Sequence, residues 1–153
     1  MLKIGIFNDD GFDAAAELLQ SIVDGVPIEI CRDMRQPLDI LIVNRVPFGS
    51  STNSEHISPK IIIANSDDKQ VLQYVSSLEA QVITYGLNPK AAVTVSSHAD
   101  DIYVICIQRA MLTIFDAPIM PREFSVSIEW CKGFDDIIVG IVTTALICGV
   151  NFE

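Results

Sequence analysis

The alternation of apolar and polar positions is clearest over residues 60–87, where it predicts a strand, a helix and a second strand. Residues 60–64 (KIIIA) form a continuous apolar run of strand length, and the side-chain oxygens of residues 65–68 (NSDD) are suited to capping a helix. A β-rich segment, residues 81–85, ends at a glycine. Between these strands, apolar residues recur at helical spacing: Val71, Leu72, Val75 and Leu78. Two parallel strands joined by a helix favour a sheet that is covered on both faces.

The N-terminal segment predicts a strand, a tight loop and a helix. Residues 2–7 are apolar, residues 8–11 (NDDG) form a turn, and Asp13 is placed to cap a helix that runs to about Asp24, with Gly25 ending it. Many α/β proteins hold phosphate groups at such an N-terminal loop. Here the loop is acidic.

Two further strands are predicted before the central unit. Residues 26–31 form a short one, and residues 38–46 (LDILIVNRV) form a buried one, with Asn44 near its carboxyl end. Open α/β sheets usually place ligands at that edge, so Asn44 is a candidate site residue. Residues 47–59 form a loop rich in Ser, Gly and Pro.

The second half of the chain has a different pattern. Short β-like segments with close turn signals favour antiparallel hairpins, and a last helix over about residues 135–148 is apolar nearly all round. We expect that helix to be buried within the chain or covered by a partner subunit. The β-like segments cover residues 91–97, 102–108, 111–115 and 124–128. The prediction is one α/β domain over residues 1–153, a three-layer Rossmann-like or P-loop-like fold with a mostly parallel sheet and a β-rich second half.

Length and hydropathy favour a water-soluble protein. The chain has 153 residues, half of them hydrophobic, and a mean hydropathy of +0.39. No apolar run approaches the roughly 20 residues that span a bilayer. The first residues, MLKIGIF, lack the length and the cleavage site of a signal peptide. We therefore predict a cytoplasmic protein with no membrane partner.

Charge and cysteine spacing exclude further classes of function. The formal net charge is -10 and the isoelectric point is about 4.4, which disfavours a nucleic-acid partner because such binding needs a clustered basic surface. The four cysteines form no close pair, so their spacing predicts neither a zinc site nor a disulfide framework. They are Cys31, Cys106, Cys131 and Cys148.

The order of these elements resembles the central ATP-binding domain of Mur ligases, which join amino acids to the UDP-MurNAc precursor of peptidoglycan. The segments ANSDD (64–68) and VITYGL (82–87) are similar to the family's NxDD turn and its ITYG strand. The resemblance aligns Asn65, Asp67 and Asp68 with the NxDD turn, and LDILIVN with the family's D-x-x-x-x-T-N strand. It covers nearly the whole chain as a pattern, with the middle segment the most similar.

The chain departs from the family at the first loop, which binds phosphate and metal in Mur ligases. Mur ligases carry G-x-T-G-T-N-G-K-[TS] at the first loop, whereas this chain has GIFNDDGFD over residues 5–13. The outer glycines, Gly5 and Gly11, agree; Phe12 stands where the family has Lys, Asp13 stands where it has the hydroxyl, and Asn8 lies inside the altered loop. The carboxylates around that loop would repel a triphosphate. Together with these departures, the resemblance implies a non-catalytic Mur-ligase-like domain that needs no cofactor. It would act as a binding or structural protein, linked to cell-wall metabolism, that binds a protein partner or itself.

A second resemblance leads to a different function. Residues 8–11 are similar to the opening of SurE-like metal-dependent nucleotidases, in which two Asp residues ligate a divalent cation. In this chain Asp9 and Asp10 would be those ligands, with Asp13 and Asn44 as further candidates. Carboxylate oxygens suit Mg²⁺ or Mn²⁺, which would activate water for phosphate-ester hydrolysis. The alternative is thus a small metal-dependent phosphatase or nucleotidase.

Overall fold

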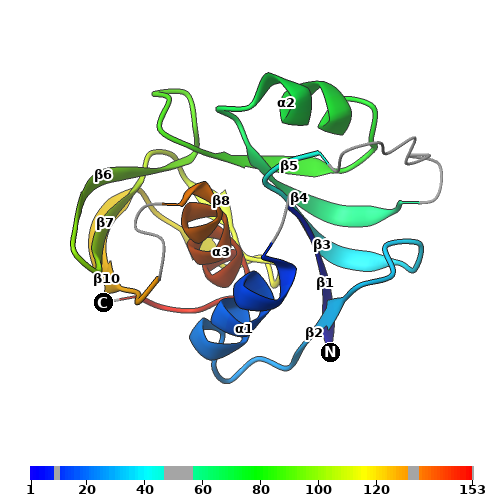
Figure 1. Cartoon of the computed structure of the whole chain (residues 1–153), viewed down its shortest axis with the longest axis horizontal. Helices are drawn as coiled ribbons and strands as arrows, with labels where there is room; N and C mark the ends of the chain where they lie inside the picture. Colours follow the sequence, from blue (N-terminus) through cyan, green and yellow to red (C-terminus); the bar gives the residue numbers. More distant parts are fainter. Residues whose placement is uncertain (9–10, 47–56, 131–134, 153) are drawn as a thin grey trace.

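The computed structural model describes residues 1–8, 11–46, 57–130 and 135–152, and these residues form an eight-stranded mixed sheet, a separate two-stranded sheet and three helices (Figure 1). The strand order in the large sheet is β10-β7-β6-β5-β4-β3-β1-β2. The strands are β1 (Leu2–Phe7), β2 (Ile28–Cys31), β3 (Leu38–Val43), β4 (Pro59–Asn65), β5 (Gln81–Tyr85), β6 (Val93–Ala99), β7 (Ile102–Ile107), β8 (Met111–Leu112), β9 (Pro118–Ile119) and β10 (Arg122–Ser127). The helices are α1 (Phe12–Ile22), α2 (Lys69–Val75) and α3 (Asp136–Ile147).

The parallel half of the sheet contains β1 to β5. Each neighbouring pair runs parallel, and β4 and β5 pair directly, with Ile62 opposite Val82 and Ile63 opposite Ile83. The strand, helix and strand predicted over residues 60–87 are therefore confirmed as β4, α2 and β5. Continuous apolar runs suit these strands because both faces of the sheet are covered.

The antiparallel half contains β6, β7 and β10. β7 pairs antiparallel with both of the other strands. The β6–β7 hairpin confirms the prediction from short connections, whereas β10 pairs with β7 across the segment that contains β8 and β9. The strand expected over residues 111–115 is shorter than predicted: only Met111–Leu112 is β8, and it pairs with β9 outside the large sheet. The turn after β8 begins early because the Thr113 hydroxyl accepts hydrogen bonds from the backbone N–H groups of Phe115 and Ala117.

Two apolar clusters place helices on opposite faces of the sheet. α1 and α3 contact each other and pack on one face, while α2 packs on the other face against β3 and β4 (Figure 1). The predicted α/β class is confirmed, with a mostly parallel sheet between two helical layers and a β-rich second half.

The apolar helix α3 is covered by the chain itself. Every residue from Ile137 to Ile147 is buried, and Figure 1 shows α3 on the concave side of the curved sheet. Its two buried polar residues are satisfied, because the hydroxyls of Thr143 and Thr144 donate to the carbonyl oxygens four residues earlier. Of the two expectations for this helix, burial within the chain and coverage by a partner subunit, the structure shows burial within the chain. α3 therefore does not provide the self-association surface that its composition suggested. Within the described residues, no helix is long and apolar enough to cross a membrane.

Candidate functional site

The candidate site lies at the carboxyl edge of the parallel strands, where β1 and β3 are neighbours. The chain leaves β1 toward β2 on one side and leaves β3 toward β4 on the other side. Such a reversal opens a crevice at the carboxyl ends of the two strands, which is the usual ligand position in open α/β sheets. Asn8 directly follows β1 and Asn44 directly follows β3.

Asn44 is the centre of a hydrogen-bonded cluster, which we call the Asn44 network (Asn8, Asn44, Asn65 and Tyr85). The Asn44 amide nitrogen donates to Asn8 Oδ1 over 2.9 Å. The Asn44 Oδ1 atom accepts from the Tyr85 hydroxyl over 2.6 Å and from Asn65 Nδ2 over 3.3 Å. Asn44 and Asn65 are 2% and 1% exposed. Because a carbonyl oxygen has two lone pairs, these two bonds occupy the acceptor positions of the Asn44 side chain.

Tyr85 enters the network from the end of β5. Burial raises the pKa of its phenol well above the ordinary value of 10.0, and the Asp136 carboxylate raises this pKa further. The hydroxyl therefore stays protonated and acts as a donor. The ring packs directly on α3, where a Cβ on Gly140 would lie 2.7 Å from Tyr85 Cζ. A glycine at this helix position is required for the ring to reach Asn44.

Arg45 connects the sheet edge to the beginnings of two helices. Its guanidinium donates to the Asn44 carbonyl oxygen over 2.8 Å and to Asp136 Oδ2 over 2.9 Å, and Nε lies 3.8 Å from Asp68 Oδ2. Asp68 caps α2 and Asp136 lies in the first turn of α3. A cavity of about 260 Å³ opens here and is lined by Arg45, Asn65, Asp67, Asp68, Lys69 and Asp136.

The turn over residues 65–68 has two functions. Asp68 accepts from the backbone N–H groups of Gln70 and Val71, which confirms it as the cap of α2. Asp67 does not cap the helix, so this part of the prediction is wrong. Its carboxylate accepts instead from the backbone N–H groups of Leu87 and Asn88, over 2.6 and 3.1 Å. Asp67 thus holds the turn after β5 in place. Its partners lie 20 and 21 residues away in the sequence, so local pattern does not predict this contact.

The turn after β5 leaves no space for a side chain. A Cβ on Gly86 would lie 2.7 Å from Asp67 Oδ1, and the φ angle of Gly86 is 155°. A glycine lets the chain pass close to the Asp67 carboxylate. The ANSDD and VITYGL segments are therefore joined by one physical contact in this chain.

The first loop is arranged differently from the sequence prediction. α1 begins at Phe12, Gly11 occupies the cap position with φ of 70°, and no side chain caps the helix. Asp13 lies in the first turn and forms an ion pair with Arg32, whose guanidinium carbon lies 4.4 Å from the centroid of the Phe12 ring. The predicted capping role of Asp13 is therefore wrong. The helix also ends earlier than expected, at Ile22.

Gly5 lies within β1 and has a packing function. A Cβ at this position would lie 2.5 Å from Met34 Sδ and 3.0 Å from Leu38 Cδ1. The glycine thus allows the chain that leads into β3 to lie against β1. Asp9 and Asp10, the predicted metal ligands, lie outside the described residues.

The structure brings some of the candidate ligands together and separates others. Asn44 is hydrogen-bonded to Asn8, whereas Asp13 is paired with Arg32. Among the described residues, no three His, Cys, Asp or Glu side chains form a group that would hold a metal ion. Sequence reasoning did not identify Tyr85 and Arg45 as site residues. Their only signal is position, since each lies at or just after the end of a parallel strand.

Comparison with protein-family models and with curated proteins identifies no relative of this chain. No protein-family model matches the chain, and no curated protein matches it. Function must therefore be inferred from the geometry of the site and from the residues themselves.

Proposed function

We propose that this protein is a non-catalytic, Mur-ligase-like domain that acts in the cytoplasm by binding a protein partner, with cell-wall metabolism as the first pathway to test. One observation carries the proposal: the polar side chains at the carboxyl edge of the sheet hydrogen-bond to one another. Asn44 accepts from Tyr85 and Asn65 and donates to Asn8. A catalytic site needs a nucleophile, a base and an orienting group directed at a substrate, and the Asn44 network contains no such set.

The first loop supports the same conclusion. Phe12 and Asp13 occupy the positions where the resemblance places a phosphate-binding Lys and a metal-binding hydroxyl. Both side chains contact Arg32, one through its ring and the other through its carboxylate. Among the described residues that line the cavity at this loop, Arg32 is the only basic one, and its charge is paired with the Asp13 carboxylate. A triphosphate would have to displace that carboxylate, which opposes ATP binding.

Calorimetric titration and thermal shift test the proposal directly. The purified chain is titrated with ATP, UDP-MurNAc and a nucleoside monophosphate, each with and without Mg²⁺ or Mn²⁺. We expect no heat and no change in Tm with ATP and Mg²⁺, because a ligand that binds the folded state must raise its Tm. Saturable ATP binding would overturn the proposal. The partner itself is sought by chemical cross-linking in cells, followed by reconstitution of the complex from purified proteins.

A metal-dependent phosphatase remains the second candidate, supported by one contact. The bond of 2.9 Å joins Asn44 to Asn8, the residue that precedes Asp9 and Asp10 in the sequence. This candidate predicts that Mn²⁺ alone raises the Tm and that Asp9→Ala removes the effect. Asp24→Ala, at an exposed position after α1, is the matched control. A metal effect that survives Asp9→Ala would exclude this loop as the site.

A further inference from the structure

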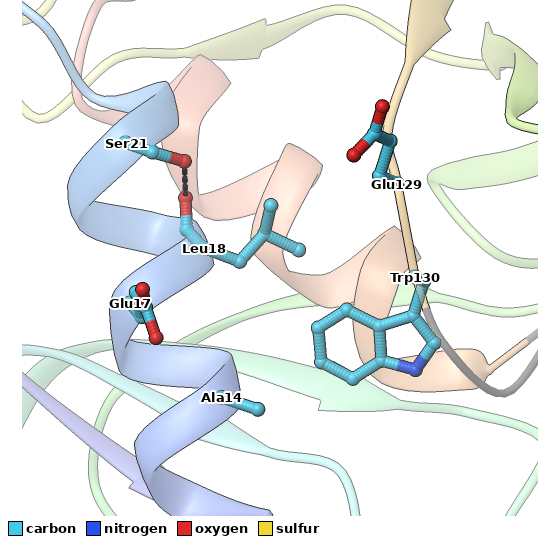
Figure 2. Close-up of a pocket in the computed structure, with 6 residues that line it drawn as sticks. All are labelled: Ala14, Glu17, Leu18, Ser21, Glu129 and Trp130. Atoms are coloured by element: carbon cyan, nitrogen blue, oxygen red, sulfur yellow. Dashed lines mark hydrogen bonds between the residues drawn. The ribbon is translucent and has the colours of Figure 1, made fainter.

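A second pocket lies away from the sheet edge, between α1 and the segment that follows β10. Its volume is about 360 Å³, within the range of small-molecule sites. α1 forms one wall, and Glu129 and Trp130 form the other (Figure 2). We call it the Trp130 pocket, and it is lined by Ala14, Glu17, Leu18, Ser21, Glu129 and Trp130.

The indole of Trp130 forms the aromatic surface of this pocket. Figure 2 shows the six-membered ring extending toward α1 and the indole nitrogen on the side away from that helix. The nitrogen is covered and has no hydrogen-bond partner among the described residues. Leu18 points toward the ring from α1. The pocket thus presents an aromatic ring and an aliphatic side chain across a gap.

Two carboxylates flank this apolar surface. Glu17 comes from α1 and Glu129 from the opposite wall, and both are exposed. In the described part of the chain, neither carboxylate forms a hydrogen bond or an ion pair, whereas Asp13 on the same helix is paired with Arg32. The described residues that line the pocket include no Lys or Arg. Within the described part of the chain, the negative charge next to this aromatic ring is therefore not compensated.

This combination of groups selects for positive charge. The face of an indole ring attracts cations more strongly than other aromatic rings do, and carboxylates add a direct Coulomb attraction. The net charge of -10 raises the local concentration of cations around the whole molecule. Two carboxylates would repel an anion, and a neutral apolar ligand would gain no Coulomb attraction from either of them.

We propose that the Trp130 pocket binds an organic cation, an alkylated ammonium or a guanidinium group, seated on the Trp130 ring between Glu17 and Glu129. The inference is independent of the function proposed for the sheet edge, since the two sites have no lining residue in common. A cation of this class is either a free small molecule or the side chain of a partner protein, and the experiment distinguishes these sources.

Trp130 provides the measurement, because it is the only tryptophan in the chain. Intrinsic fluorescence is followed during titration with choline and, separately, with its neutral carbon isostere dimethylbutanol. We expect a saturable change with choline, a much weaker response to dimethylbutanol, and weaker choline binding at higher ionic strength. A saturable response to dimethylbutanol equal to the response to choline would overturn the proposal.

Charge-neutral variants locate the effect. Glu17→Gln and Glu129→Gln should each weaken choline binding by about two- to fivefold, because each removes one carboxylate from an exposed cation site. Glu79→Gln is the matched control, since Glu79 is exposed and does not line the pocket. Affinities of both variants equal to that of the control would contradict the proposed site. Trp130→Leu, followed by calorimetry because the fluorophore is lost, should abolish binding while the circular dichroism melt remains cooperative.

A last arm of the experiment identifies the source of the cation. Acetyl-arginine amide carries the group that a partner protein would present, and choline represents a free metabolite. Tighter binding of acetyl-arginine amide, lost in Glu129→Gln, would assign the pocket to a protein side chain. Tighter binding of choline would assign it to a free alkylated ammonium. Either order supports the cation site, and failure of both compounds to bind excludes it.

Discussion

The carboxyl edge of the sheet and the Trp130 pocket show two opposite uses of polar side chains. At the edge, Asn44 and Asn65 are buried and hydrogen-bonded to each other. In the pocket, Glu17 and Glu129 are exposed and form no hydrogen bond or ion pair with the described residues. Buried polar groups must be paired in the folded chain, whereas exposed ones remain open to a ligand. The polar side chains of the Asn44 network thus bind one another at the usual ligand position of this fold. The carboxylates that are open to a ligand lie instead in the Trp130 pocket.

Asn44→Ala should produce the largest effect on stability. The substitution removes the side-chain partner that Asn8, Asn65 and Tyr85 share. It leaves the buried Tyr85 hydroxyl unsatisfied, while Asn65 Nδ2 keeps its bond to the Asn44 backbone carbonyl oxygen. We expect the free energy of unfolding to fall by about 3 kcal/mol, since each buried group left without a partner costs about 1 to 3 kcal/mol. Urea denaturation followed by circular dichroism measures it. Asn151→Ala, at an exposed position, is the control. A loss no larger than that of the control would show that the network does not stabilise the edge.

Tyr85→Phe tests one bond of the same network and should cost about 1 to 2 kcal/mol near neutral pH. Burial raises the pKa of the Tyr85 phenol in the folded state above 10.0. The stabilisation that the neutral phenol gives the folded state is therefore present below pH 10.0 and is lost as the pH rises further. The difference in unfolding free energy between wild type and Tyr85→Phe should therefore shrink in alkaline solution. A difference that stays constant across this range would contradict the buried, neutral phenol.

Asp39→Asn concerns a paired carboxylate at the start of β3 and should have a smaller effect. Burial raises the pKa of Asp39, but the Lys3 backbone N–H and the Lys60 ammonium outweigh burial and hold this pKa below 3.8. The stabilisation is therefore present above pH 3.8 and is lost as the pH falls below it. We expect a loss of about 0.5 to 1 kcal/mol near neutral pH that disappears in acid. Acid titration of the unfolding free energy, with Asp24→Asn as control, measures it.

Glu17→Gln and Glu129→Gln should have the smallest effect on the fold. Each side chain is exposed and has no hydrogen-bond or ion-pair partner within the described ranges, so the free energy of unfolding should change by no more than about 0.5 kcal/mol in either direction. The same two variants weaken cation binding in the test described above. A large loss of stability in either would mean that its carboxylate supports the fold and is not held open for a ligand.

Local patterns were enough to predict much of the fold. The apolar run before Asp68 predicted β4, and the Asp68 side chain caps α2 as expected. The hairpin formed by β6 and β7 was also predicted, because a short turn favours antiparallel neighbours. These features depend on residues that are close in sequence.

The candidate site was only partly predictable. Asn44 was expected at the carboxyl edge, and the structure places it there. Its partners are remote: Tyr85 is 41 residues away, and the contact between Arg45 and Asp136 joins residues 91 apart. The same reasoning failed for Asp13 and Asp67, where a local cap was predicted and a distant partner binds the carboxylate instead.

The sequence by itself determined the elements of this protein, their order and the acidic character of the chain, because period, caps and turns act between neighbouring residues. Only the tertiary structure decided that β1 lies between β2 and β3, that α3 is enclosed by its own chain, and which polar groups are paired. Hydrogen-bond partners across the sheet depend on strand order, and burial depends on which elements cover each other. The sequence therefore does not show that Glu17 and Glu129 are exposed, or that the side chains of the Asn44 network are hydrogen-bonded to one another. Only the tertiary structure shows this difference.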